Sequence, residues 1–336
     1  MGLFQPTRTR PFTDEGGHPL PGSVATLERV RLGGLDQLVV TRGADTKNPL
    51  LLWLHGGPGA SDLGALTRFN PELERRFTVV HWSQPGTAQS FDPRATPESL
   101  GDERLIADAV EIARRMLARF GQEKLVVAGQ SMGTTVGLTL ARRYPELVHA
   151  YVGVNQVVDR AAEEDRCRNA AMALAEARGD RKALEALARL PPKDELIRDI
   201  DALLVLKTVT REMGIVSHDP AFFRAFAKAV ILAPEFTWTY LFRFVKALMV
   251  ATKLSFVPRC RFDLFAQPSA VPVPIFLVAG RHDLYTSAEL AGEWLAGVEA
   301  PHKELHVLDG AAHLACYEAP EAFDRILIDR VLPLAR

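Results

Sequence analysis

Cysteine is scarce in this sequence, and its distribution excludes two common uses of the residue. The 336-residue chain has three cysteines, Cys167, Cys260 and Cys316, which lie far apart and form no C-x-x-C pair. This spacing argues against a structural metal site and against a small secreted domain held by disulfides. We therefore expect reduced thiols in a cytoplasmic protein that holds no metal ion.

Long hydrophobic runs and an excess of one charge are also missing. The most apolar stretch, after Pro234, is interrupted by Arg243, Lys246 and Lys253, so it does not predict a bilayer-spanning helix. The first residues, MGLFQPTRTRPFTDEGG, lack the apolar core of a signal peptide. Lys and Arg total 40 against 41 Asp and Glu, a balance that gives no footprint for nucleic acid or an anionic membrane. We expect a small-molecule or short-peptide substrate as partner, and the oligomeric state stays open.

The apolar residues that are present, 47% of the chain, form alternating strands and helices. From about residue 24 to residue 43 the pattern predicts a β-hairpin. After it, short continuous apolar runs, typical of strands buried on both faces, are separated by segments of helical periodicity. This pattern predicts an α/β fold, with a mostly parallel central sheet and helices on both faces. The runs are PLLLWLH, FTVVHW, KLVVAG, AYVGVN and VPIFLVAG.

The alternation stops between residues 156 and 267, where helical segments follow one another. No convincing strand interrupts this stretch, and the alternation resumes with VPIFLVAGRHD. An α/β sheet interrupted in this way is one core with an inserted helical lid. We predict a core formed by residues 1–155 and 268–336 and a lid formed by residues 156–267.

The stretch VVAGQSMGTT places Ser131 between two glycines, where a predicted strand gives way to a predicted helix. Gly129-Gln130-Ser131-Met132-Gly133 fits G-x-S-x-G, in which a tight strand-to-helix turn raises the serine hydroxyl above the sheet. Neighbouring side chains would collide in such a turn, which explains the glycines. A serine that only caps the helix is the alternative, but the flanking strand and helix favour a nucleophile.

A serine nucleophile needs a base to take its proton and an acid to orient that base. In this topology the acid and then the histidine follow the serine, each after a later strand. Asp283 ends VPIFLVAGRHD and His313 ends ELHVLDGAAH, so order and placement both fit. Asp159 is a rival for the acid, because some sheets of this kind place it after the strand that follows the nucleophile helix. We predict Ser131, Asp283 and His313 as the catalytic residues.

Acyl transfer also needs backbone N–H donors that stabilise a tetrahedral oxyanion. Met132 follows the nucleophile at a helix N-terminus, and HGGPG, residues 55–59, follows the first core-type strand. We predict an oxyanion hole formed by the N–H groups of Gly57 and Met132. No Lys-Ser/Thr follows HGGPG, so this loop is not a phosphate-binding P-loop. The chemistry requires no cofactor.

HGGPG, SQPG, GQSMG, GRHD and the terminal GAAH resemble the proline iminopeptidase branch of the α/β-hydrolases, a family of serine peptidases. The similarity extends from about residue 24 to the C-terminus, and the lid matches in kind. It implies the α/β-hydrolase fold, a lid over the active site and the roles assigned above to Ser131, Asp283 and His313. It also implies removal of an N-terminal residue from a small peptide or amide.

Two positions depart from that branch. Met132 stands where the family usually has tryptophan, and the loop Ser83-Gln84-Pro85-Gly86 replaces DQRG, which removes an acid and a base. The alternative activity is therefore that of an esterase, lactonase or thioesterase on an apolar small molecule. An acyl transferase and a non-catalytic ligand-binding scaffold are further alternatives.

Aminopeptidases of this branch need lid carboxylates that hold the free amine of the substrate. Glu235, which stands before an aromatic helical segment, is our first candidate. Glu163, Glu164 and Glu212 are weaker candidates, and the alternative for each is a solvated helix charge.

The lid segment FTWTYLFRFVKALM is rich in aromatic residues. At helical spacing, Trp238, Phe242, Val245 and Met249 form one apolar face. We expect most of this stripe to pack on the core, and we expect Trp238 and Phe242 to contribute to a substrate pocket. Such a pocket favours apolar esters or amides over highly charged substrates.

Overall fold

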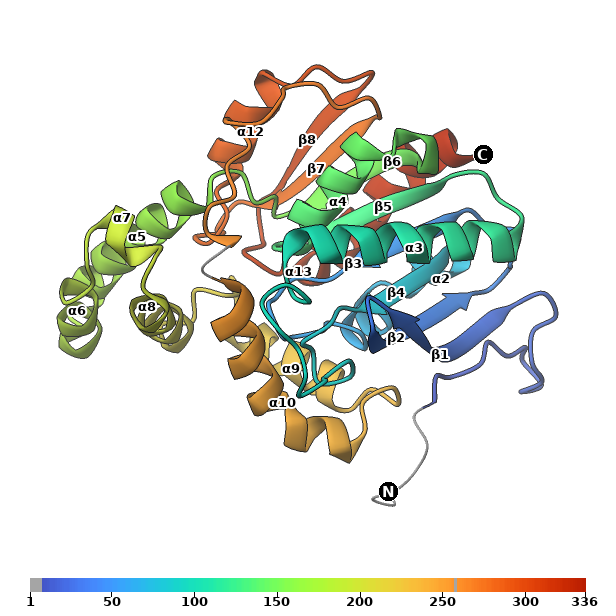
Figure 1. Cartoon of the computed structure of the whole chain (residues 1–336), viewed down its shortest axis with the longest axis horizontal. Coiled ribbons are helices and arrows are strands. Elements are labelled where there is room, and N and C mark those ends of the chain that lie inside the picture. The colour runs from blue at the N-terminus through green and yellow to red at the C-terminus, as the bar shows by residue number, and fades with distance from the viewer. Residues whose placement is uncertain (1–7, 257–258) are drawn as a thin grey trace.

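The computed structural model describes residues 8–256 and 259–336, so residues 1–7 of the predicted core and 257–258 of the predicted lid lie outside the described residues. An eight-stranded sheet passes through the molecule in the order β1-β2-β4-β3-β5-β6-β7-β8 (Figure 1). The pairs β1–β2 and β2–β4 are antiparallel and all others are parallel, which confirms the predicted sheet. The strands are β1 (Val24–Leu32), β2 (Leu35–Gly43), β3 (Leu50–Leu54), β4 (Thr78–Ser83), β5 (Leu125–Gln130), β6 (Val148–Val154), β7 (Ile275–Gly280) and β8 (Lys303–Leu308).

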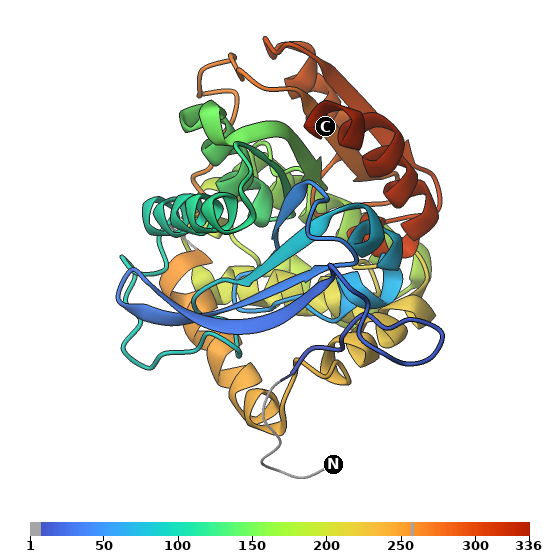
Figure 2. The ribbon, with the colours of Figure 1, turned by 90° about the vertical axis from the view of Figure 1, so that its right-hand side faces the viewer.

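Helices cover both faces of this sheet (Figure 2), because successive residues of a strand point to opposite faces and both faces are apolar. In β3, Leu50 and Leu52 belong to a buried cluster shared with α3, α4 and α12. Leu51 and Trp53 belong to a second cluster, shared with α1, α2, α13 and α14. These helices are α1 (Ala65–Phe69), α2 (Pro71–Arg76), α3 (Asp102–Phe120), α4 (Gly133–Arg143), α12 (Ala288–Ala296), α13 (Ala315–Glu318) and α14 (Pro320–Ile326).

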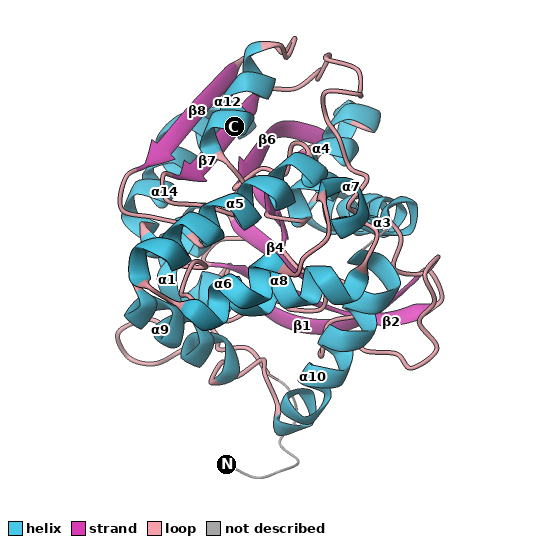
Figure 3. Ribbon diagram, turned by 90° about the vertical axis from the view of Figure 1, so that its left-hand side faces the viewer, coloured by secondary structure: helices cyan, strands magenta, loops and turns pink. Residues whose placement is uncertain are grey.

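The described residues between β6 and β7 form helices and no strand (Figure 3). Several of these helices share a buried cluster with Met132 and Tyr285, so they pack over the carboxyl ends of β5 and β7. In the described ranges, no helix is long and apolar enough to cross a bilayer. The helices are α5 (Arg160–Arg178), α6 (Arg181–Ala188), α7 (Lys193–Leu196), α8 (Ile200–Glu212), α9 (Pro220–Ile231) and α10 (Trp238–Ala251), followed by the π-helical turn Thr252–Phe256.

The described part of the N-terminal segment packs against β2. The Arg42 guanidinium donates to the Thr9 hydroxyl at 2.5 Å and lies 4.9 Å from the centre of the Phe12 ring. A short antiparallel bridge joins Thr13 to Pro19. The sequence leaves open whether this segment packs on the core, and these contacts place residues 9–12 on the sheet.

Candidate active site

Ser131 lies in the turn between β5 and α4, in a backbone conformation that side chains rarely adopt. Its φ is +51°, in the left-handed region. The turn is tight, because a Cβ at Gly133 would lie 2.0 Å from the Leu54 carbonyl oxygen, and a Cβ at Gly129 would lie 2.6 Å from the Gly133 carbonyl oxygen. Both flanking positions therefore require glycine, as expected for a serine raised on a strand-to-helix turn.

The Ser131 hydroxyl, the His313 ring and the Asp283 carboxylate form one chain of hydrogen bonds. Ser131 Oγ lies 2.9 Å from His313 Nε2, and His313 Nδ1 donates to Asp283 Oδ2 at 2.8 Å. These residues follow β5, β8 and β7, so the structure brings together three side chains that are distant in the sequence. The rival acid, Asp159, instead caps α5 by accepting from the Ala162 N–H at 3.0 Å.

Sequence reasoning missed the donors that surround Asp283. The Asn155 amide donates to its Oδ2 at 2.5 Å, the Tyr285 and Thr286 N–H groups donate to Oδ1 at 2.7 and 3.1 Å, and the Thr286 hydroxyl donates to Oδ2. Burial alone would raise the pKa of Asp283, but the His313 ring and these hydrogen bonds outweigh burial and lower it. The only signal in the sequence was the placement of Asn155 at a strand end.

The HGGPG loop lies directly against the serine. A Cβ at Gly56 would lie 3.2 Å from Ser131 Cβ, so the loop backbone approaches the nucleophile as closely as glycine permits. Gly57 is the next residue, with φ +155°, and Met132 is the N-cap residue of α4. Both predicted oxyanion donors therefore belong to backbone that flanks Ser131.

Neutral hydrogen bonds join this loop to the SQPG segment. The Gln84 N–H donates to His55 Nε2 at 3.0 Å, and the Gln84 side-chain amide donates to the His55 carbonyl at 2.8 Å. Burial lowers the pKa of His55 to about 4, so the ring is neutral at pH 7 and its Nε2 can accept. The departure from DQRG therefore leaves an uncharged contact between the two loops.

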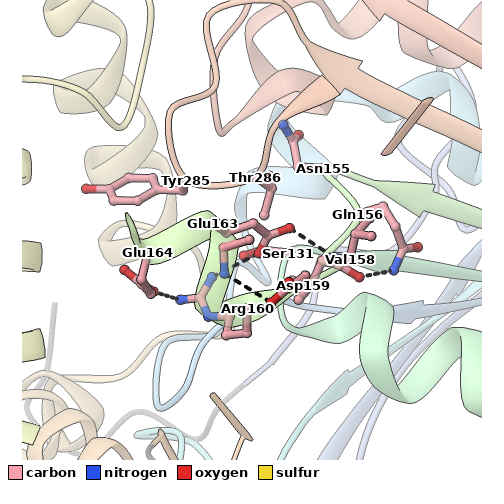
Figure 4. Close-up of polar contacts among 12 residues, drawn as sticks. Ser131, Asn155, Gln156, Val158, Asp159, Arg160, Glu163, Glu164, Tyr285 and Thr286 are labelled. Carbon is pink, nitrogen blue, oxygen red and sulfur yellow. Dashed lines mark hydrogen bonds and ion pairs between the residues drawn. The ribbon is translucent and has the colours of Figure 1, made fainter. Parts of the chain in front are cut away.

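Two lid carboxylates, Glu163 and Glu164 at the start of α5, lie close enough to the catalytic residues for their charges to interact (Figure 4). Glu164 pairs with Arg160 and, at 2.6 Å, with Lys207, while Glu163 accepts from the Val158 N–H at 2.9 Å. Burial raises the pKa of Glu163 to about 8. Burial would also raise the pKa of Glu164, but the two cations outweigh it and lower that pKa. At pH 7 the cluster therefore holds one ionised carboxylate between two cations. Among the residues that the structure describes, there is no group of three or more His, Cys, Asp or Glu side chains that could hold a metal ion.

Three residues predicted to bind substrate lie elsewhere. Glu235 is 2% exposed and lines a separate small pocket that includes none of the residues of the hydrogen-bonded chain. Trp238 and Phe242 are 48% and 76% exposed, so the structure does not place them in a substrate pocket. The expectation that their stripe packs on the core is wrong, because α10 packs through its other face. The buried residues of that face are Tyr240, Ala247 and Ala251.

Comparison with known proteins gives a family match over most of the chain. The family model described as alpha/beta hydrolase fold matches residues 49–320. "Probable aminopeptidase YbaC" from Bacillus subtilis (strain 168) is 29% identical over 309 residues, which cover 92% of this chain and 97% of that protein. A 2-hydroxy-6-oxononadienedioate/2-hydroxy-6-oxononatrienedioate hydrolase from Pseudomonas putida is 26% identical over 321 residues, covering 91% and 96%.

Solved structures of similar fold include the proline iminopeptidase of Mycobacterium smegmatis, with a TM-score of 0.66 and 17% identity over 92% of this chain and 99% of that one. A proline iminopeptidase-related protein from Thermus thermophilus has a TM-score of 0.65 and 18% identity, covering 93% and 99%. At these identities the likeness concerns the fold.

Proposed function

Because this chain belongs to the α/β-hydrolase fold family, we propose that it is a serine hydrolase that cleaves a small amide or ester through an acyl-enzyme intermediate. The observation that carries this proposal is the hydrogen-bonded chain in which Ser131 Oγ lies 2.9 Å from His313 Nε2 and His313 Nδ1 lies 2.8 Å from Asp283. A hydroxyl, an imidazole and a carboxylate in this order supply a nucleophile, a general base and the group that orients the base.

The reaction proceeds in two steps. Ser131 Oγ attacks the acyl carbonyl while His313 Nε2 takes its proton, and the N–H groups of Gly57 and Met132 stabilise the oxyanion. The protonated ring then gives this proton to the leaving group, and the acyl group stays on the serine. A water molecule, deprotonated by the same ring, attacks the acyl-enzyme, and the ring returns the proton to Ser131 Oγ as the bond to the acyl group breaks and the acid leaves. The buried Asp283 carboxylate keeps the ring oriented and stabilises its charged form.

The preferred substrate is an amide with a free N-terminal residue, as for an aminopeptidase of the proline iminopeptidase type. The HGGPG and GQSMG motifs and the relative named a probable aminopeptidase support this choice. Glu163 and Glu164 are lid carboxylates whose charges interact with those of Asp283 and His313, so they replace Glu235 as candidates for holding the substrate amine.

A second candidate is an esterase that acts on apolar acyl groups. It is favoured by the charges around the site, because Arg160 and Lys207 already pair with Glu164 and Glu163 has its pKa raised to about 8 by burial. An incoming ammonium group therefore meets no unpaired ionised carboxylate in this cluster.

A panel of aminoacyl β-naphthylamides, led by the prolyl compound, and p-nitrophenyl esters separates the two candidates. An aminopeptidase turns over the naphthylamides, and Glu163→Gln or Glu164→Gln raises KM for them at least about tenfold, while KM for the esters stays the same. Glu212→Gln is the matched control, because Glu212 belongs to a lid helix but has a side chain that is 56% exposed. If only esters react and both variants keep the parent KM, the aminopeptidase proposal fails and the esterase stands.

A further inference from the structure

Helix α10 lies at the edge of the molecule (Figure 1) and presents exposed apolar side chains to solvent. Trp238, Phe242, Val245 and Met249 are 48, 76, 68 and 39% exposed, and their spacing places them on one side of the helix. We call these four residues the α10 stripe. Soluble proteins rarely leave a continuous apolar surface of this kind uncovered, and such surfaces mark contacts with other proteins or with membranes.

The exposed charged side chains of α9, of α10 and of the turn that follows α10 all have the same sign. Arg243 and Lys246 on α10 and Lys253 just after it are exposed, and Arg224 and Lys228 on α9 add further exposed positive charge. Glu235, the one acidic residue between residues 220 and 256, is 2% exposed. No ion pair between described residues involves any of these five cations.

We propose that the α10 stripe is a surface that adsorbs to an anionic lipid bilayer. A helix with an exposed apolar face and basic flanks lies in the membrane interface, with its apolar side chains among the acyl chains and its cations at anionic headgroups. The expectation that the protein has no membrane partner depends on the charge of the whole chain, whereas the exposed charges of α9, of α10 and of Lys253 are all positive.

The same charges argue against a second copy of the chain as the occupant. A two-fold symmetric dimer buries the same patch on both subunits, so the cations that flank the stripe would enter one interface from both subunits. Like charges brought together at an interface weaken association. An anionic bilayer provides negatively charged headgroups for the cations and acyl chains for the apolar side chains of the stripe.

The inner face of α10 packs on the HGGPG loop. A Cβ at Gly59 would lie 2.8 Å from Leu248 Cα and 3.1 Å from Ala251 Cβ, so helix and loop are in direct contact. Adsorption through α10 would therefore hold this side of the candidate active site close to the lipid surface. The proposal itself concerns binding and does not depend on the proposed hydrolase activity.

Trp238 supplies a built-in probe. It is one of four tryptophans, and the others, Trp53, Trp82 and Trp294, are 0, 0 and 4% exposed. Fluorescence is recorded while the full chain is titrated with vesicles of phosphatidylglycerol and phosphatidylcholine. The emission is expected to shift to shorter wavelength, and the apparent affinity is expected to fall at least about tenfold on pure phosphatidylcholine vesicles.

Variants test the same surface by vesicle flotation. Phe242→Ser, and separately Arg243→Glu with Lys253→Glu, are each expected to weaken binding at least about tenfold. The controls are Phe265→Ser, at a residue that is 53% exposed and does not belong to α10, and Lys47→Glu with Arg76→Glu, two exposed cations on the core. The proposal is overturned if the protein does not bind anionic vesicles, or if the controls weaken binding as much. It is also overturned if the Trp238 emission shifts with protein concentration alone, which would identify a second copy as the occupant.

Discussion

Asn155 and Asp283 follow the neighbouring parallel strands β6 and β7, and the Asn155 side-chain amide donates to the Asp283 carboxylate at 2.5 Å. Asn155 has φ +51°, a left-handed conformation that asparagine tolerates better than most residues. The segment after β6, where Asp159 was considered as the acid, therefore contributes the Asn155 amide instead. This amide binds Asp283, which follows the neighbouring strand β7. One buried oxygen, Asp283 Oδ2, thus binds both Asn155 and His313.

Replacing Asn155 by aspartate tests this contact with almost no change in shape. The new carboxyl group would lie beside the Asp283 carboxylate, and like charges at this distance raise the pKa of the pair. We expect kcat/KM for p-nitrophenyl acetate to fall about tenfold or more, with the acidic limb of its pH profile moved to higher pH. Asn169→Asp, at an exposed position of α5, should leave the profile unchanged. An unchanged profile in Asn155→Asp would show that the amide does not tune the acid.

Gly133→Ala is expected to destabilise the protein strongly. Its Cβ would lie 2.0 Å from the Leu54 carbonyl oxygen and 2.7 Å from that of His55, both on backbone that cannot move without disturbing the sheet. Thermal unfolding should reveal a loss of about 3 kcal/mol or more in the free energy of unfolding. Gly310→Ala, where no atom lies within 4 Å of the added Cβ, should change it by no more than about 0.5 kcal/mol. Equal effects would contradict the tight turn described here.

Glu163 makes the stability of the protein depend on pH in a predictable direction. Burial raises its pKa in the folded protein to about 8 from an ordinary value of 4.5. The unfolded chain therefore loses this proton at lower pH than the folded protein, and the stabilising contribution is lost as pH rises towards 8. The Tm of Glu163→Gln minus that of the parent should accordingly increase from pH 5 to pH 8.

Glu164 is expected to give the opposite pH dependence of stability, so it serves as the comparison for the Glu163→Gln measurements. Its pKa is lowered in the folded protein, since Arg160 and Lys207 outweigh burial. Its contribution is therefore present above the unfolded pKa and is lost as the pH falls through the folded pKa. Glu164→Gln should be most destabilised near neutral pH and less so in acid. The same trend in both variants would contradict the assignment of a protonated Glu163 and an ionised Glu164 at pH 7.

The order of strands and helices and the three residues of the hydrogen-bonded chain could be predicted because each has a local signal. A buried strand reads as a short apolar run, and Ser131, Asp283 and His313 each follow such a run. Contacts such as Asn155 to Asp283 and Gln84 to His55 have no such signal. They arise only when the sheet places distant loops side by side.

The orientation of α10 could not be predicted for a different reason. The helix is apolar almost all round, so periodicity identifies more than one face that could pack on the core. The bulky stripe at Trp238 and Phe242 was chosen, whereas the small side chains Ala247 and Ala251 pack inward. Small residues permit the close contact with the loop at Gly59, and only the folded structure reveals that requirement. Glu235, the first candidate for an amine anchor, precedes α10 and lies buried at a separate small pocket.

Labelling by a fluorophosphonate probe, followed by mass spectrometry of the modified peptide, tests the nucleophile most directly. The parent protein should be labelled on Ser131, and Ser269→Ala, at an exposed serine, should label equally. His313→Ala should react at least about a thousandfold more slowly, because the hydroxyl loses its base. Ser131→Ala should fold normally and carry no label. A parent protein that stays unlabelled, or a Ser131→Ala protein that labels as fast as the parent, would contradict the assignment of Ser131 as an activated nucleophile.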